Sequence, residues 1–168
     1  MSARTATILM LATVTFVIHG CGTSEPADGH EHTPHEGVVA ALAGTPSPGY
    51  VELKLHDDKG DLELWLAKDQ AISDPLDLPL AAEVSVQFFD AVARTVTLRA
   101  RNQEKNEDED GNTNVRDGKT NYFIYPSREG EDASWLQGAG FSSAVIVRFQ
   151  HEGATVESQK FILKPHVH

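Results

Sequence analysis

Short runs of alternating apolar and polar residues, separated by turn residues, fill the sequence from Val38 onward. The clearest is YVELKLHDDKGDLELWL, residues 50–66, where aliphatic side chains recur at every second position on both sides of DDKG, residues 57–60. A period of two is typical of a half-buried strand, and Asp and Gly are common in turns. The segment is therefore predicted to be a β-hairpin with one face in solvent.

The same pattern predicts further strands along the chain. Two more pairs are expected in residues 83–101 and 142–164, the latter turning at HEG, residues 151–153, with single strands at VVAAL, residues 38–42, and TNYFIY, residues 120–125. No stretch shows a helical period. About eight short strands with polar faces predict an all-β, antiparallel, immunoglobulin-like β-sandwich, although the Cys-Trp-Cys pattern of true immunoglobulin domains is absent.

The first 21 residues have a different composition. Arg4 is their only charged residue, and the apolar run from Ala6 to Ile18 is shorter than a comfortable membrane span, which is the layout of a secretory signal. Ile18-His19-Gly20-Cys21 resembles the lipobox of bacterial lipoproteins, with a less usual His at the position two before the cysteine. We therefore expect a signal peptide at 1–20, a tether at 21–37 and a sandwich domain at 38–168.

The lipoprotein resemblance implies a fate for Cys21 and an address for the protein. It implies cleavage before Cys21 and acylation of that residue with a diacylglyceryl group and a fatty acid such as palmitate, which makes a stable membrane anchor. Gly22 rather than Asp after the cysteine implies the periplasmic face of the outer membrane in a Gram-negative cell, or the cell membrane otherwise. Cys21 is the only cysteine, so no intramolecular disulfide can form; the alternative is a free thiol near a terminus.

Length and charge narrow the class further. A chain of 168 residues suits one domain, and its formal net charge of −11 disfavours nucleic acid as a partner. Such a charge attracts cations, although a solvated acidic surface is the ordinary interpretation. We expect no enzyme, because the sequence contains no G-x-S-x-G, no H-E-x-x-H and no phosphate-binding glycine loop.

Histidines gather at both ends of the chain. Imidazole suits Zn(II), Cu(II) and Ni(II), and short histidine tracts with neighbouring carboxylates indicate metal binding. One hypothesis is that both tails close a single site; the alternative is polar tails that bind metal only incidentally. Residues 30–66 also resemble small β-rich periplasmic domains associated with heavy-metal efflux, which implies metal handling without naming the metal. The candidate metal ligands are His30, His32, His35, His166 and His168.

Two further polar segments are weaker candidates. In NEDEDGNTNVRD, the residues Asn106, Asp108, Asp110 and Asp117 stand at the first, third, fifth and twelfth positions of an EF-hand-like calcium loop. Asp instead of Glu at the twelfth position and flanking strands weaken this hypothesis, and an acidic solvated loop is the alternative. His56 beside Asp57 and Asp58 is a third candidate ligand cluster, but we expect these three to be exposed turn residues.

These observations favour a lipid-anchored periplasmic β-sandwich that binds a transition metal ion through histidine-rich termini, as buffer, sensor or delivery partner. The alternative is a structural or protein-interaction lipoprotein without a metal role, whose protein partner the sequence does not identify. Trp65 and Trp135 are expected to pack in the core.

Overall fold

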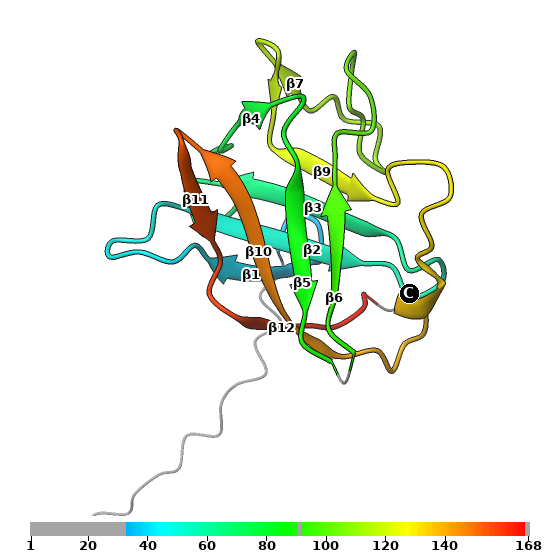
Figure 1. Cartoon of the computed structure of the whole chain (residues 1–168). Coiled ribbons are helices and arrows are strands. Elements are labelled where there is room, and N and C mark those ends of the chain that lie inside the picture. Colours follow the sequence, from blue (N-terminus) through cyan, green and yellow to red (C-terminus); the bar gives the residue numbers. More distant parts are fainter. Residues whose placement is uncertain (1–32, 91, 167–168) are drawn as a thin grey trace, which may run out of the picture. The chain divides into compact units, whose positions relative to one another are not determined.

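The computed structural model describes residues 33–90 and 92–166. They form an antiparallel β-sandwich, which confirms the predicted all-β fold (Figure 1). One sheet has the strand order β1-β2-β3-β9, and the other has the order β11-β10-β5-β6, with β12 also paired to β10. The strands of the first sheet are β1 (Val38–Ala41), β2 (Tyr50–Leu55), β3 (Leu62–Ala67) and β9 (Tyr122–Tyr125); those of the second are β5 (Val84–Phe88), β6 (Arg94–Leu98), β10 (Ser143–His151), β11 (Ala154–Glu157) and β12 (Phe161–Leu163).

The core lies between the two sheets, whose strands cross at a steep angle in Figure 1. Side chains at every second position of each strand point inward, as alternation requires. Leu53 and Leu64, which are cross-strand partners in β2 and β3, are fully buried and pack in the same cluster as Val86 and Val147 of the opposite sheet. The predicted pairing of residues 83–101 and 142–164 is confirmed, including a two-residue turn at Glu152 and Gly153.

Backbone hydrogen bonds join the two sheets along both sides. On one side, Arg99 and Ile124 exchange N–H···O bonds of 3.1 and 2.9 Å, just beyond β6 and within β9. On the other, the Ala43 N–H donates to Glu157 and the Gln159 N–H donates to Ala41. Among the described residues, these bonds cover part of each edge of the first sheet.

The prediction of about eight strands omitted four short ones. One is β12, already described. The other three are β4 (Leu78–Pro79), β7 (Val115–Arg116) and β8 (Lys119–Thr120), and together they form a small third sheet. The one helical segment in the described ranges is a 3₁₀ turn, η1 (Ser134–Leu136), and no helix there is long and apolar enough to cross a bilayer. Trp65 and Trp135 both pack against apolar clusters, as expected.

The prediction that the β2–β3 hairpin has one face in solvent is wrong. The outward-pointing residues Glu52, Lys54, Glu63 and Trp65 are all buried, with exposed fractions of 3% or less. Two segments contact this face: the strap, which we define as residues 33–37, and the acidic loop, defined as residues 101–114. Polar alternation here marks a covered face and not a wet one.

Residues 33–37, which we expected to belong to the flexible tether, pack on the sheet instead. The backbone N–H groups of His35 and Gly37 donate to the carboxylate of Glu52 at 3.1 and 2.9 Å. Gly37 permits this close approach, because a Cβ at that position would lie 2.8 Å from Cγ of Glu52. Charge-assisted bonds to a buried carboxylate thus fix the strap.

Candidate metal centre

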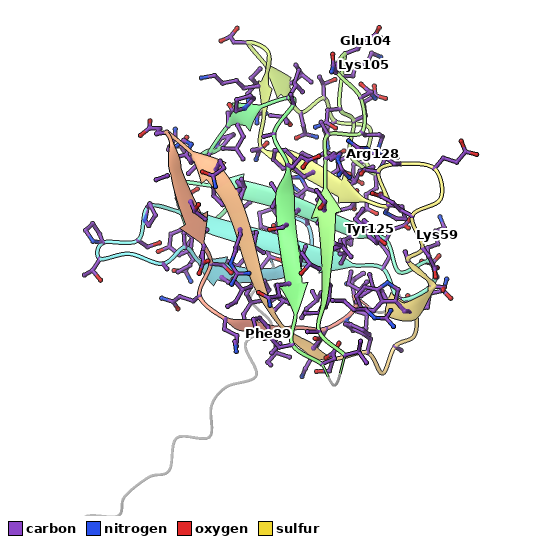
Figure 2. The ribbon with its side chains drawn as sticks, viewed as in Figure 1. Lys59, Phe89, Glu104, Lys105, Tyr125 and Arg128 are labelled. Atoms are coloured by element: carbon purple, nitrogen blue, oxygen red, sulfur yellow. The ribbon has the colours of Figure 1, made fainter. Side chains whose placement is uncertain are left out.

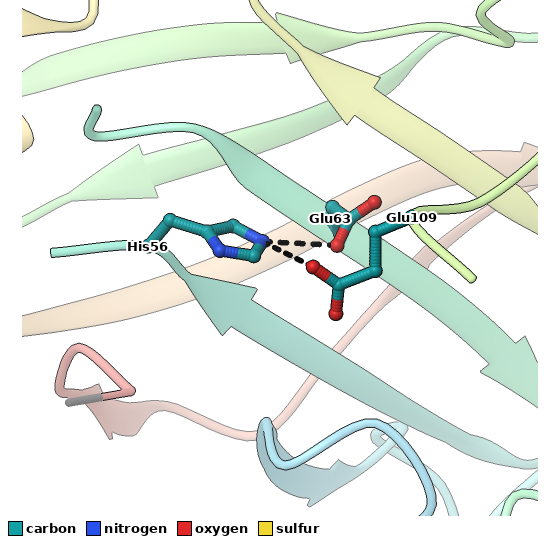
Figure 3. A group of neighbouring side chains, drawn as sticks. All are labelled: His56, Glu63 and Glu109. Carbon is teal, nitrogen blue, oxygen red and sulfur yellow. Dashed lines mark hydrogen bonds and ion pairs between the residues drawn. The ribbon is translucent and has the colours of Figure 1, made fainter. Parts of the chain in front are cut away.

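His56 lies at the end of β2 with two glutamates around its outer ring nitrogen. Its Nε2 is 3.0 Å from Oε2 of Glu63, on β3, and 3.6 Å from Oε2 of Glu109, in the acidic loop (Figure 3). These three ligand atoms all lie within 4.8 Å of one another. Imidazole and carboxylate are the donors that Zn(II) and Cu(II) take from proteins.

The second oxygen of each glutamate is held by another protein group. Oε1 of Glu63 accepts a hydrogen bond from the Tyr122 hydroxyl, and Oε1 of Glu109 pairs with the ammonium of Lys54. Both carboxylates are therefore oriented so that their Oε2 atoms converge on His56. Such outer contacts orient the ligands of protein metal sites.

The charges of this cluster shift its pKa values in opposite directions. The hydrogen bond with Glu63 raises the pKa of His56 above its ordinary value, and the carboxylate of Glu109 adds to the effect. Burial alone would raise the pKa of Glu63, but its hydrogen bonds with His56 and Tyr122 outweigh burial and lower it. Burial, together with Glu63, raises the pKa of the Tyr122 hydroxyl, which therefore stays a donor. The two glutamates thus favour the protonated form of the His56 imidazole.

The cluster opens into a cavity of about 540 Å³. The side chains of Glu63 and His56 are 5% and 14% exposed, whereas that of Glu109 is 39% exposed. Acidic side chains outnumber basic ones around the cavity, which favours the entry of cations. The charged residues of the lining are Asp58, Asp61, Glu63, Asp108 and Glu109, with Lys59 and Arg101 opposing them.

His35 forms a second histidine–glutamate contact on the same face of the sheet. Its Nδ1 lies 2.8 Å from Oε2 of Glu52, and its ring stacks on Trp65 with centroids 3.9 Å apart and planes 2° apart. Hydrogen bonds from His35 and the strap lower the pKa of Glu52 although burial opposes them. Trp65 is itself almost fully buried, and its indole N–H has no hydrogen-bond partner among the described residues.

The described parts of the two tails meet. Nε2 of His166 lies 3.0 Å from Oε2 of Glu36, and the His166 N–H donates to the carbonyl of Leu55. A parallel bridge pairs His166 with His56, the metal-cluster histidine. His35 and His166 of the predicted ligand set therefore lie on the strap and on the segment beside it, while His30, His32 and His168, like Cys21, lie outside the described residues.

The candidate calcium loop uses its polar groups within the protein. The Asn106 side chain is buried, accepts from the Arg101 N–H and donates to Thr120 and Tyr122. Oxygens of Asp108 accept from Asn112 and Asn114. Asp110 is exposed, and Asp117 stands in the β7–β8 turn with Gly118, both at positive φ. These contacts account for the loop without calcium, so the calcium hypothesis gains no support from them.

Sequence reasoning missed Glu63 and Glu109. It considered His56 as a ligand only together with Asp57 and Asp58, and favoured an exposed turn. The nearby aspartates at 57 and 58 are not in the cluster; the partners come from across the hairpin and from the acidic loop. One signal was available, because Glu52, Lys54 and His56 share a strand face and Glu63 pairs with Lys54 in register. Nothing in the sequence pattern indicates that Glu109 folds back over this face.

No protein-family model matches the sequence, and neither a curated protein nor a solved structure is significantly similar to the chain.

Proposed function

We propose that this is a lipid-anchored periplasmic protein that binds a transition metal ion, with His56, Glu63 and Glu109 as its ligands. The observation that supports it most is the convergence of one imidazole nitrogen and two separately anchored carboxylate oxygens at the mouth of an acidic cavity. The anchor is proposed from the lipobox ending at Cys21.

The dimensions of the cluster suit Zn(II) or Cu(II). Metal–ligand bonds of about 2.0–2.2 Å in a tetrahedral site place ligand atoms about 3.4 Å apart. The two distances from His56 Nε2, 3.0 and 3.6 Å, bracket this value. An ion would replace the proton that the imidazole carries between the two carboxylates, because a ligating nitrogen must be unprotonated.

Three protein ligands leave a coordination position directed at the cavity. A site of this kind exchanges its ion more readily than a closed four-ligand structural site. Among the three roles considered, the geometry therefore favours buffering or delivery of the ion. His166 pairs with His56 through a backbone bridge and contacts the strap that carries His35, so these two histidines are the nearest candidates for further imidazole ligands during exchange.

The alternative is that the cluster is a buried charge network in a structural or interaction lipoprotein. The Lys54–Glu109 pair favours it, since a lysine already neutralises one of the ligand carboxylates. The two functions differ in one measurable respect. A metal site binds the added ion, and this binding stabilises the fold by RT ln(1 + [L]/Kd). A charge network neither binds the ion nor is stabilised by it.

Calorimetric titration of Zn(II) and Cu(II) into the unlipidated chain of residues 22–168 tests the proposal. We expect saturable one-to-one binding that His56→Ala weakens by at least about tenfold, as loss of a ligand or of its support does. His151→Ala is the matched control, because this histidine lies in the β10–β11 hairpin, outside the cluster.

Two outcomes would redirect the proposal. If His56→Ala binds as well as the parent chain while His166→Ala or deletion of residues 22–37 abolishes binding, the ligands are in the tails. Equal, weak binding of several ions in every variant would favour the structural or interaction lipoprotein.

A further inference from the structure

The described part of the chain exposes three large apolar side chains, and all three are close to one end of the sandwich. Phe89 is 36% exposed, Val92 66% and Ile162 51%. Exposed apolar residues scattered singly need no explanation, but a group of them indicates a contact surface.

Backbone pairing places these residues together. The Phe89 N–H donates to the carbonyl of Ala144 at 2.9 Å, and Ala144 is the cross-strand partner of Ile162. Phe89, Ala144 and Ile162 form a row on the outer face of the second sheet. Their chain neighbours Phe88, Val145 and Leu163 are buried and point into the core. Val92 stands in the β5–β6 turn, three residues after Phe89. We call Phe89, Val92 and Ile162 the apolar tip.

Basic side chains flank the apolar tip in an otherwise acidic protein. The ammonium of Lys160 lies 4.0 Å from the centroid of the Phe89 ring. Lys164 is also exposed, and residues 158–166 contain no acidic side chain, whereas the whole chain has a net charge of −11. Asp90 is the acidic residue in the β5–β6 turn. Apolar side chains with lysines beside them suit the interface of an anionic lipid bilayer.

The place where the described chain begins agrees with this. The strap contacts the segment that follows β12 through Glu36 and His166, and β12 itself packs beside β1. Only residues 22–32 separate Thr33 from Cys21, and so short a linker spans at most about 4 nm. Figure 2 shows Phe89 beside β12, at the opposite end from Glu104 and Lys105. A lipid on Cys21 would keep Thr33 within about 4 nm of the bilayer.

We infer that the apolar tip docks on the lipid bilayer, with Phe89, Val92 and Ile162 in the interface and Lys160 and Lys164 at the headgroups. This inference rests on the anchored part of the proposed function. It is independent of the metal cluster, which lies on the outer face of the other sheet. Docking here orients the protein relative to the membrane and adds a second membrane contact to the lipid anchor.

Vesicle sedimentation with the unlipidated chain of residues 22–168 tests this inference. We expect partitioning onto phosphatidylethanolamine–phosphatidylglycerol vesicles that weakens on neutral phosphatidylcholine. The double variant Phe89→Asp with Val92→Asp should reduce the partition coefficient by about tenfold or more, since two apolar side chains no longer enter the interface. Ala71→Asp with Thr113→Asp is the matched control, because it adds the same charge at two exposed positions elsewhere.

A second variant tests the inference by a gained fluorescence signal and not by a loss of binding. Val92→Trp should bind vesicles at least as well as the parent chain, and its tryptophan emission should shift to shorter wavelength when vesicles are added. Absence of vesicle binding, or equal reduction by the control variant, would overturn the inference. So would a dimer in solution that Phe89→Asp with Val92→Asp converts to a monomer, since the apolar tip would then bind a second copy.

The anchor is tested separately. Palmitate labelling of the full chain that Cys21→Ser abolishes supports the anchor, whatever the vesicle assay shows. Failure of labelling with intact vesicle binding would remove the anchor and leave the apolar tip as the membrane contact.

Discussion

The outer faces of the two sheets carry similar alternating sequences but lie in different environments. In β5 and β10 the outward residues are half-exposed, and Arg148 of β10 forms a solvent-facing ion pair with Glu157 of β11. In β2 and β3 the outward residues Glu52, Lys54 and Glu63 are buried beneath the strap and the acidic loop. The same pattern of polar positions thus gives a wet surface in one sheet and a buried charge network in the other.

This difference has an energetic consequence. A surface ion pair contributes little, because water screens it and two long side chains lose entropy to form it. Buried charges have lost their hydration, so each must keep its partners. The described structure meets this requirement with a shared set of contacts, in which Glu63 binds both His56 and Tyr122. Such a network is costly to maintain, which makes it a better candidate for function than the wet face.

The largest expected effect comes from removing one carboxylate from the buried face. Glu63→Leu removes the acceptor of the Tyr122 hydroxyl and the carboxylate that lies 3.0 Å from His56 Nε2, so the free energy of unfolding should fall by about 3 kcal/mol. Glu157→Leu on the wet face breaks an exposed pair with Arg148 and should cost less than about 1 kcal/mol. Urea denaturation of both variants, with EDTA present, measures the difference. Equal losses would mean that the buried network is no more important than the surface pair.

The contrast between the faces also shows what sequence could predict. The hairpins were predictable because alternation and turn residues are local signals, and the register of Val51 with Leu66 follows from them. The burial of Glu52 and Glu63 was not, because it depends on two segments that fold back from elsewhere in the chain. The β7–β8 hairpin shows a local signal that was overlooked: Asp117-Gly118 is a favoured two-residue turn, whereas we considered Asp117 only as the twelfth position of a candidate calcium loop.

The candidate site was predictable to a smaller extent than the fold. Histidine composition drew attention to His35 and His166, whose segments meet at Glu36. The three-residue cluster depends on Glu109, which lies far along the chain from His56 and reaches it only through the acidic loop. Contacts of such sequence separation leave no periodic signal, since periodicity reports only which face of its own strand a residue occupies.

A smaller effect is expected in the pH dependence of the free energy of unfolding, in its acid limb below about pH 6. The pKa of Glu52 is lowered from its ordinary value of 4.5, so the unfolded chain binds its proton first as the pH falls. The stability that Glu52 contributes is therefore fully present above pH 4.5 and is lost as the pH falls through the folded-state pKa. His35 faces Glu52 directly, and Lys54 follows it on the same strand face. Glu52→Gln should flatten this limb in urea midpoints measured between pH 3 and 6, and Glu157→Gln, on the solvent-exposed face, is the matched control.

The smallest effect concerns the strap that covers one part of this face. His35→Ala removes the Nδ1 contact to Glu52 and the ring that stacks on Trp65, but it keeps the backbone N–H bonds of the strap. We expect a loss of about 1 kcal/mol in the free energy of unfolding and a rise in the exposure of Trp65 to quenchers. Acrylamide quenching separates this from Trp135, because Trp135→Phe removes the second tryptophan.

If quenching is unchanged in His35→Ala, the remaining backbone bonds to Glu52 suffice to hold the strap. The face would then stay buried without any histidine, and the His35 side chain would be free to serve as a metal ligand at little cost in stability. A large increase in quenching would instead make the His35–Trp65 stack the contact that closes the strap. Binding of an ion by His35 would then have to break this stack and open part of the covered face of β2 and β3.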